Sequence, residues 1–288
     1  MAETNTARDQ ALELNREQKA FYEKKVEQKR RLNPVMKLWE AWRDRVYRIW
    51  EGIGVFDDVL RLHREWVGDL TGKRVLDLGC YTGNRLSLEL ASKSSFYLGI
   101  DLSENALAKL RERIEKAGIR NAEVRAVDFL SKDFDYEPFD LIYCNAVLHH
   151  FKDFDLVMSL LSQRLAPGGR IVSFDPLETA LVVRLVRRIY RPFQTNAAWE
   201  WPFKQHNFAT IEKYFRIDKV QGVVGLSKWV LPLAALPIFA NATTRLGRKL
   251  HESDLRESRQ LDSKLWRCMS VNLCLVQKGP AATPHRGA

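Results

Sequence analysis

Residues 75–84 read VLDLGCYTGN, and this stretch decides the fold class. An apolar run leads into Asp77, and Gly79 and Gly83 follow it closely. Glycines allow a tight turn and a close approach of the backbone to a ligand before a helix begins. The stretch therefore predicts a strand, a ligand-facing turn and the start of a helix. By itself this arrangement is compatible with any nucleotide-like ligand.

The same rhythm continues toward the C-terminus, where short apolar runs alternate with helical segments. The expected strands are residues 74–78, 95–100, 123–127, 141–144 and 170–174, and the expected helices are residues 85–91, 104–117 and 155–165. Because neighbouring parallel strands need crossover connections, this alternation predicts a parallel sheet with helices on both faces. Such sheets bind their ligands at the carboxyl ends of the strands.

Two further carboxylates follow the second and third expected strands. Asp101 ends FYLGID (96–101) and comes 18 residues after Gly83, close to the spacing of about 20 that places a carboxylate on ribose hydroxyls. Asp128 in AVDFL (126–130) comes at the same height, where it can accept a hydrogen bond from an adenine amine. Three carboxylates on one rim repel one another unless a ligand with donors or positive charge lies between them. A pyrophosphate cofactor would match this rim poorly.

These motifs, in this order, resemble those of a known family. VLDLGCYTGN (75–84), GIDLSENAL (99–107), AVDFL (126–130), FDLIYCNAVLHHF (139–151) and LAPGGRIV (165–172) are similar to the successive motifs of class I S-adenosylmethionine-dependent methyltransferases of the small-molecule branch. The resemblance covers about residues 73–176 and, weakly, 208–278. It implies a Rossmann-like, seven-stranded, mostly parallel sheet whose last strand, about residues 267–277, runs antiparallel.

The resemblance also implies the contacts to S-adenosylmethionine. Asp77 and the turn of Gly79, Tyr81 and Gly83 would face the methionine part, and Asp101 would bind the ribose. Leu102 would pack on the adenine face, and Asp128 would bind the adenine amine, with Phe129 beside it. Asn145 and Ala146 would line the methyl-transfer edge. Tyr81 stands where the family usually has glycine. Either the turn differs there, or the tyrosine ring closes one wall of the pocket. No metal site is predicted.

An oxygen or carbon acceptor would also need a base. His149 and His150 follow the fourth expected strand, and His206 lies in EWPFKQHNF (200–208) as a weaker candidate. A histidine that titrates near neutrality suits proton abstraction, although one of the pair can instead simply pack or cap the loop. Two other functions stay open. The resemblance favours a methyltransferase that methylates an oxygen or carbon of a small acceptor, and the alternatives are a non-catalytic S-adenosylmethionine-binding protein and an enzyme of this fold that cyclises or isomerises its substrate.

The charge distribution bears on the acceptor. The net charge of +10 divides unevenly, with −5 over residues 51–180 and +11 over residues 181–288. LVVRLVRRIY (181–190) is typical of a basic amphipathic helix, and WVLPLAALPIFA (229–240) is uncharged. Both segments favour a small, hydrophobic or lipid-like acceptor and a peripheral contact with anionic membranes. The alternative is that they form a lid packed on the sheet edge. No nucleic-acid signature follows the fourth strand.

Three helices are expected before the first strand, at residues 9–32, 35–50 and 56–66. In the second, Trp39 and Trp42 belong to an apolar stripe that is either core or a wall of the acceptor site. The expected organisation is a helical extension over residues 1–68, a cofactor-binding core over 69–178 and an acceptor-binding or lid region with the last two strands over 179–288. No apolar run approaches the length of about 20 residues that spans a bilayer. We therefore expect a cytoplasmic protein, or one peripheral at the membrane surface.

Overall fold

The computed structural model describes residues 2–28, 34–194, 197–232 and 240–278. Within this part, the strands are β1 (Arg74–Leu78), β2 (Phe96–Asp101), β3 (Ala122–Ala126), β4 (Phe139–Asn145), β5 (Leu165–Pro176), β6 (Phe215–Val223) and β7 (Ser270–Gln277). They form one sheet in the order β3-β2-β1-β4-β5-β7-β6. β7 pairs antiparallel with both β5 and β6, and the pairs from β3 to β5 are parallel. The predicted fold class is thus confirmed.

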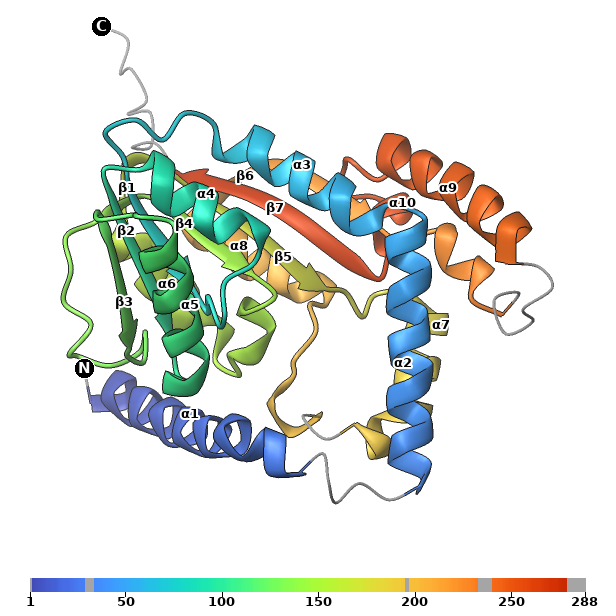
Figure 1. Cartoon of the computed structure of the whole chain (residues 1–288), viewed down its shortest axis with the longest axis horizontal. Helices are drawn as coiled ribbons and strands as arrows, with labels where there is room; N and C mark the ends of the chain where they lie inside the picture. Colours follow the sequence, from blue (N-terminus) through green and yellow to red (C-terminus); the bar gives the residue numbers. More distant parts are fainter. Residues whose placement is uncertain (1, 29–33, 195–196, 233–239, 279–288) are drawn as a thin grey trace, which may run out of the picture.

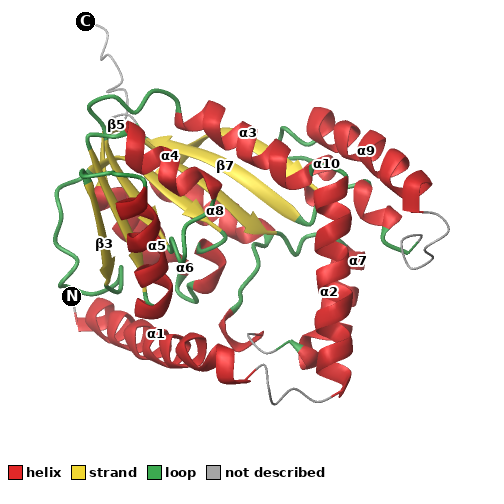
Figure 2. Ribbon diagram, viewed as in Figure 1, coloured by secondary structure: helices red, strands yellow, loops and turns green. Residues whose placement is uncertain are grey.

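The helices surround this sheet (Figure 2). They are α1 (Ala2–Gln28), α2 (Pro34–Gly52), α3 (Val55–Val67), α4 (Arg85–Lys93), α5 (Glu104–Lys116), α6 (Phe154–Arg164), α7 (Leu181–Tyr190), α8 (Gln205–Tyr214), α9 (Ala240–Glu257) and α10 (Ser263–Trp266), with the short 3-10 turns η2 (Leu148–His150), η3 (Arg191–Phe193), η4 (Ala197–Trp199) and η5 (Ser227–Val230). Side-chain caps fix where helices start. Asn84 accepts from two amides at the start of α4, and Ser103 caps α5 in the same way.

Successive strand residues point into two separate cores. Val75 packs with α3, α4 and α5 on one face, whereas its neighbour Leu76 packs with α6 and α8 on the other. Both faces of the central strands are therefore buried, as expected for parallel strands between helix layers. Figure 1 shows α4 and α5 in front of the sheet. This two-sided burial holds the strand ends, and hence the site, in place.

β5 is longer than expected. Residues 165–169 (LAPGG) are predicted as a turn before a strand at 170–174, but the structure places them within β5. Leu165 pairs with Phe139 and Arg170 pairs with Leu141, with a register irregularity between the two pairs. A bulge lets glycine-rich backbone continue along a strand, so the prediction of the boundary is wrong.

Of the three N-terminal helices, α1 and α3 pack on the sheet and its core, whereas α2 contacts α3 and η3. Figure 1 shows α1 crossing beneath the arrowhead end of β3, and α2 standing at the other side of the molecule. The ring of Phe21 in α1 lies 4.5 Å from that of Trp199 in η4, between centroids. α1 therefore extends from β3 to η4 along the edge at which parallel strands end.

The apolar segment 229–240 is only partly visible, since residues 233–239 lie outside the described part. Among the residues that are described, no helix combines the length and apolarity required to cross a bilayer. The helix predicted at 181–190 coincides with α7. Of the two segments that favour membrane contact, only α7 lies entirely within the described residues.

Candidate functional site

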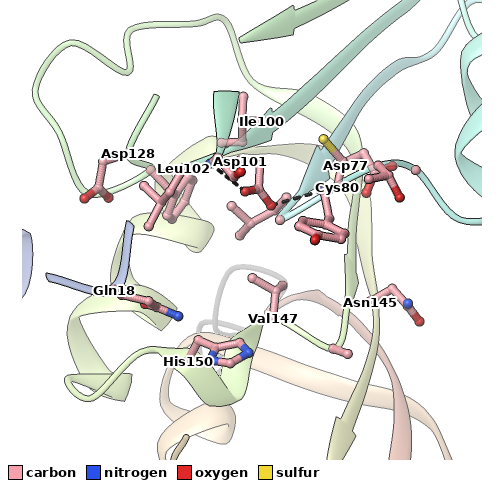
Figure 3. A pocket seen from close by; sticks show the side chains of 18 of the residues that line it. Gln18, Asp77, Cys80, Ile100, Asp101, Leu102, Asp128, Asn145, Val147 and His150 are labelled. Atoms are coloured by element: carbon pink, nitrogen blue, oxygen red, sulfur yellow. Dashed lines mark hydrogen bonds between the residues drawn. The ribbon is translucent and has the colours of Figure 1, made fainter. Parts of the chain in front are cut away.

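A cavity of about 590 Å³ opens at the carboxyl ends of β1, β2 and β4. Its lining includes all ten residues predicted for the cofactor: Asp77, Gly79, Tyr81, Gly83, Asp101, Leu102, Asp128, Phe129, Asn145 and Ala146. Figure 3 shows the carboxylates along one side, with Gln18 and His150 across from them. The topology thus gathers residues that are up to 69 positions apart in the sequence around one space. Their part in binding stays a prediction.

The carboxylate of Asp101 is held by backbone amides. Ser103 N donates to its Oδ1 at 2.9 Å, and Tyr81 N donates to its Oδ2 at 3.0 Å. Burial raises the pKa of Asp101, while these amide bonds oppose the rise. Each carboxylate oxygen has a second lone pair, so Asp101 is pre-oriented to accept a pair of hydroxyl donors.

Asp77 lies deeper and is fully buried. The Tyr97 hydroxyl donates to its Oδ2 at 2.7 Å. Burial raises the pKa of Asp77 to about 6, hydrogen bonds from Ser87 and Tyr97 lower it, and the neighbouring charge of Asp101 adds to the rise. The charge of this carboxylate therefore changes close to neutral pH.

Cofactor binding should weaken as the pH falls through about 6. Because a cationic ligand favours the ionised carboxylate, protonation of Asp77 removes part of the attraction. A group with this pKa is about one quarter ionised at pH 5.5, so the affinity should fall about fourfold between pH 7.5 and 5.5. Calorimetric titration with S-adenosylmethionine across this range measures the change. Asp77→Asn should bind more weakly and lose the pH dependence, and a flat wild-type profile would contradict the assignment.

The glycine turn uses its amides internally. Gly79 N and Cys80 N both donate to the carbonyl of Ile100, at 2.8 and 3.0 Å, and Gly83 N donates to the carbonyl of Cys80 at 2.7 Å. These amides therefore do not form a cradle for a phosphate. The three carboxylates on the same rim are hydrogen-bond acceptors, so they fit a ligand that brings hydroxyls, amines and positive charge, as S-adenosylmethionine does.

Tyr81 adopts the backbone conformation that a glycine would take there. Its φ is 49°, in the left-handed region. The side chain is 52% exposed and lines the cavity. The turn therefore keeps its shape despite the tyrosine, and the ring also forms part of a wall.

Gly79 is required by its backbone angle and by the space around it. Its φ is +68°, and an added Cβ would lie 2.4 Å from Val147 Cγ2. Gly79→Ala should lower the free energy of unfolding by about 2–4 kcal/mol, because left-handed strain and overpacking add. Urea unfolding measures it. Gly118→Ala is the matched control, since Gly118 has φ +67° and open space around it, and should lose only about 1–2 kcal/mol. Equal losses would show that the Val147 contact relaxes freely.

α1 contributes residues to the cavity that the sequence did not reveal. Asn15 and Gln18 are buried and line it. Asn15 Nδ2 lies 3.0 and 2.9 Å from the two carboxylate oxygens of Asp128, and Leu130 N also donates to Oδ1. Burial raises the pKa of Asp128. Asn15 and Gln18 lie three residues apart on a highly charged helix. This pair of uncharged amides on one face is the sequence signal that could have identified them.

α2 supplies a tyrosine to the cavity, and this residue was not part of the expected stripe. Tyr47 lines the cavity and stacks on Phe56, with ring centroids 5.8 Å apart. Trp50 packs instead against a small core around Ile53 and Val59. The side chain of Trp39 lies outside the described residues. On this helix, Tyr47 therefore forms part of the cavity wall, whereas Trp50 packs on the core.

The three candidate histidines lie in different environments. His150 lines the cavity, and its Nδ1 lies 2.6 Å from the carbonyl oxygen of Trp199. Since a carbonyl only accepts, Nδ1 carries the proton in the neutral ring and Nε2 carries the lone pair. His206, exposed at the start of α8, is not among the residues that line the cavity. The structure does not bring it to the others.

His149 is buried behind His150, with ring centroids 4.2 Å apart. Its Nδ1 lies 2.9 Å from Asp175 Oδ1, and its backbone N also donates to that oxygen. Burial lowers the pKa of His149 to about 4 and raises that of Asp175 well above its ordinary value. The pair therefore supports η2 from below, and His150 is the histidine that faces the cavity.

A buried chain of hydrogen bonds braces the glycine turn. Asn84, which lines the cavity, donates to the Tyr143 hydroxyl at 3.2 Å. That hydroxyl lies 3.1 Å from His63 Nδ1, and His63 Nε2 lies 2.9 Å from Asn272 Oδ1. The chain links the turn to α3 and to β7. It was not predicted, because its members are spread over 209 residues, from His63 to Asn272.

Residues 69–218, just over half of the chain, match the model of a methyltransferase domain family. The chain belongs to this family. The resemblance that the motifs carry to class I S-adenosylmethionine-dependent methyltransferases is thereby confirmed.

Curated relatives match part of the chain. It is 29% identical over 140 residues to the ubiquinone biosynthesis O-methyltransferase of Aromatoleum aromaticum, covering 46% of this chain and 58% of the relative. It is 30% identical over 120 residues to the demethylmenaquinone methyltransferase of Lactococcus lactis, covering 41% and 47%. It is 32% identical over 129 residues to the 24-methylenesterol C-methyltransferase 2 of Oryza sativa, covering 43% and 36%. The chain therefore spans about half the length of these relatives or less.

Solved structures share the fold. The phosphoethanolamine N-methyltransferase 2 of Haemonchus contortus superposes with a TM-score of 0.51 at 18% identity, covering 77% of this chain and 53% of that one. An S-adenosylmethionine-dependent methyltransferase of Mesorhizobium loti superposes with a TM-score of 0.51 at 19% identity, covering 74% and 94%. At this identity the likeness supports the fold alone.

Proposed function

We propose that the chain transfers the methyl group of S-adenosylmethionine to a hydroxyl of a small, lipid-like acceptor of the quinol type. The observation that carries this proposal is the single cavity in which the three strand-end carboxylates and His150 face one another. The acceptor class is supported by the relatives, which are named for ubiquinone, menaquinone and sterol substrates. A chain acting on such an acceptor would work at a membrane surface, as a peripheral protein.

The carboxylates would hold the cofactor. Asp101 would accept from the ribose hydroxyls, Asp128 from the adenine amine, and Asp77 would face the methionine part. When bound, S-adenosylmethionine supplies a methyl group on a positively charged sulfur, and the acceptor oxygen takes that methyl while the sulfur keeps the electron pair of the broken bond. The rigid strand ends would contribute mainly by alignment, which can supply about 7–11 kcal/mol of the barrier.

His150 would take the proton of the acceptor hydroxyl. Its Nδ1 position opposite the Trp199 carbonyl sets the tautomer, so Nε2 is the basic atom. Tyr47 and Tyr81 give the cavity half-exposed aromatic walls, which suit a flat ring because aromatic pairs gain from stacked and edge contacts. The walls would also exclude water around the reacting oxygen.

The experiment uses trideuteromethyl S-adenosylmethionine with a water-soluble, short-chain quinol and with a membrane lipid extract. Mass spectrometry should detect a product that carries a trideuteromethyl group on the acceptor oxygen. Saturable cofactor binding without any labelled product would favour the non-catalytic binding protein. A rearranged but unlabelled product would favour the cyclase or isomerase.

A further inference from the structure

α7 presents its apolar side to solvent. Leu181, Leu185 and Ile189 follow one another at four-residue spacing, so they lie on one face of the helix, and they are 64%, 53% and 72% exposed. Val186 beside them is 51% exposed. Among the described residues, four of the eleven exposed large hydrophobic side chains lie on this one ten-residue helix. A helix on the surface of a globular protein normally turns such a face inward.

Arginines border this apolar face. Arg184 and Arg188 are exposed and lie four residues apart on the same flank, and exposed Arg191 follows in η3. Arg184 and Arg188 bring cationic groups to the margin of the apolar face, where long side chains can extend toward anionic headgroups. Residues 181–288 as a whole carry a charge of +11.

The inner side of α7 adjoins the reacting end of the cavity. Val183 is buried beneath the helix. Arg191, just after it, lies with its Nη2 3.3 Å from the carbonyl oxygen of Glu200, the residue that follows Trp199. Trp199 in turn holds His150 through its carbonyl. A surface covered by the outer face of α7 would therefore lie close to the histidine end of the cavity rather than the adenine end.

We propose that the outer face of α7 docks on anionic lipid membranes, with Leu181, Leu185 and Ile189 in the headgroup region and the arginines on lipid phosphates. The charge favours this partner over a second copy of the chain, because two such faces would bring six arginines together. The proposal rests on the proposed function, since it places the cavity beside the membrane that would hold the acceptor. It also assigns α7 to the membrane contact, whereas the sequence left this helix open between a membrane contact and a lid on the sheet edge.

Co-sedimentation with vesicles of phosphatidylcholine and phosphatidylglycerol tests the docking. The wild-type chain should bind, and raising the salt concentration should release it through screening. Arg184→Gln/Arg188→Gln should weaken binding about 25-fold, since each arginine near an anionic surface is worth about fivefold in partitioning. Leu185→Asp/Ile189→Asp should weaken it about tenfold or more, because apolar area leaves the headgroup region.

Matched controls remove the same charge or apolarity elsewhere. Lys109 and Arg120 are exposed on and after α5, so Lys109→Gln/Arg120→Gln lowers the charge equally, and Leu261→Asp alters an exposed leucine beyond α9. Both controls should bind vesicles like the wild type. If they weaken binding as strongly as the α7 variants, net charge rather than this face is responsible, and the proposal is overturned.

Activity separates this proposal from the function on which it rests. The α7 variants should methylate a short-chain quinol in solution at the wild-type rate and lose turnover of a long-chain quinol in vesicles. If the wild type methylates the soluble quinol but does not bind vesicles, the docking proposal fails and the function stands. The wild type could instead sediment as a dimer and fail to bind vesicles, while the α7 variants sediment as monomers. This result would assign the face to a second copy of the chain and overturn the docking proposal.

Discussion

Replacing Asp101 with alanine should weaken S-adenosylmethionine binding by about 1.5–3 kcal/mol, which is the usual loss for a charged hydrogen bond. The affinity would then fall roughly 10-fold to 150-fold. Two effects combine, because Asp101 would accept from the ribose and also anchors Tyr81 N and Ser103 N in the structure. Calorimetric titration with S-adenosylmethionine and with its demethylated product measures the loss.

Two variants separate the effects of this substitution. Asp101→Asn keeps one accepting oxygen and should lose less affinity than alanine. Asp69→Ala removes an exposed carboxylate just before β1, at the opposite edge of the sheet, and should bind like the wild type. Unchanged affinity of Asp101→Ala, with unchanged thermal stability, would mean that the ribose does not lie at the end of β2.

His150→Phe should lower kcat for a hydroxyl acceptor by about 10²–10⁴-fold, the range of general base catalysis. Cofactor affinity should stay within about twofold, since a ring of similar size remains in the wall and no predicted cofactor contact is removed. Single-turnover assays with the short-chain quinol give both quantities.

The other histidines serve as controls for this experiment. His206→Phe should leave kcat unchanged, because His206 lies on the surface of α8 away from the cavity lining. His149→Phe should lower the melting temperature, since it removes the imidazole partner of the buried Asp175 carboxylate, but should lower kcat far less than His150→Phe does. If His149→Phe lowers kcat by about 10²-fold or more and His150→Phe does not, the base is assigned to the wrong ring.

The order of the strands and helices between β1 and β5, and their bounds to within about two residues except at the start of β5, were predictable from the sequence. β1 begins and ends where the apolar run predicts, and α5 begins at Glu104 as expected. Local rules are sufficient there, because strand period, turn glycines and helix caps all lie within about ten residues of one another. The boundary that was wrong, at the start of β5, depends on a bulge that only pairing with Phe139 reveals.

The residues that distant segments bring to the cavity and its support were not predictable in the same way. Tyr47, Asn15 and Asp175 reach their positions through contacts with segments far from them in sequence, such as the bond from Asn15 to Asp128. No periodicity distinguishes Tyr47 from the tryptophans beside it on α2. Only the packing of α2 against α3 and η3 decides which of these rings turns toward the cavity.

The order of apolar runs, glycines and acidic strand ends was enough to establish the class of fold and the rim on which its ligand lies, because parallel sheets place their carboxyl ends together whatever covers them. Folding of the whole chain was needed to choose among chemically similar side chains. It set His150 in the cavity and His149 against Asp175, and it turned the apolar side of α7 outward. Such choices follow from which surfaces meet in space, and that depends on contacts between distant segments that no short stretch of sequence contains.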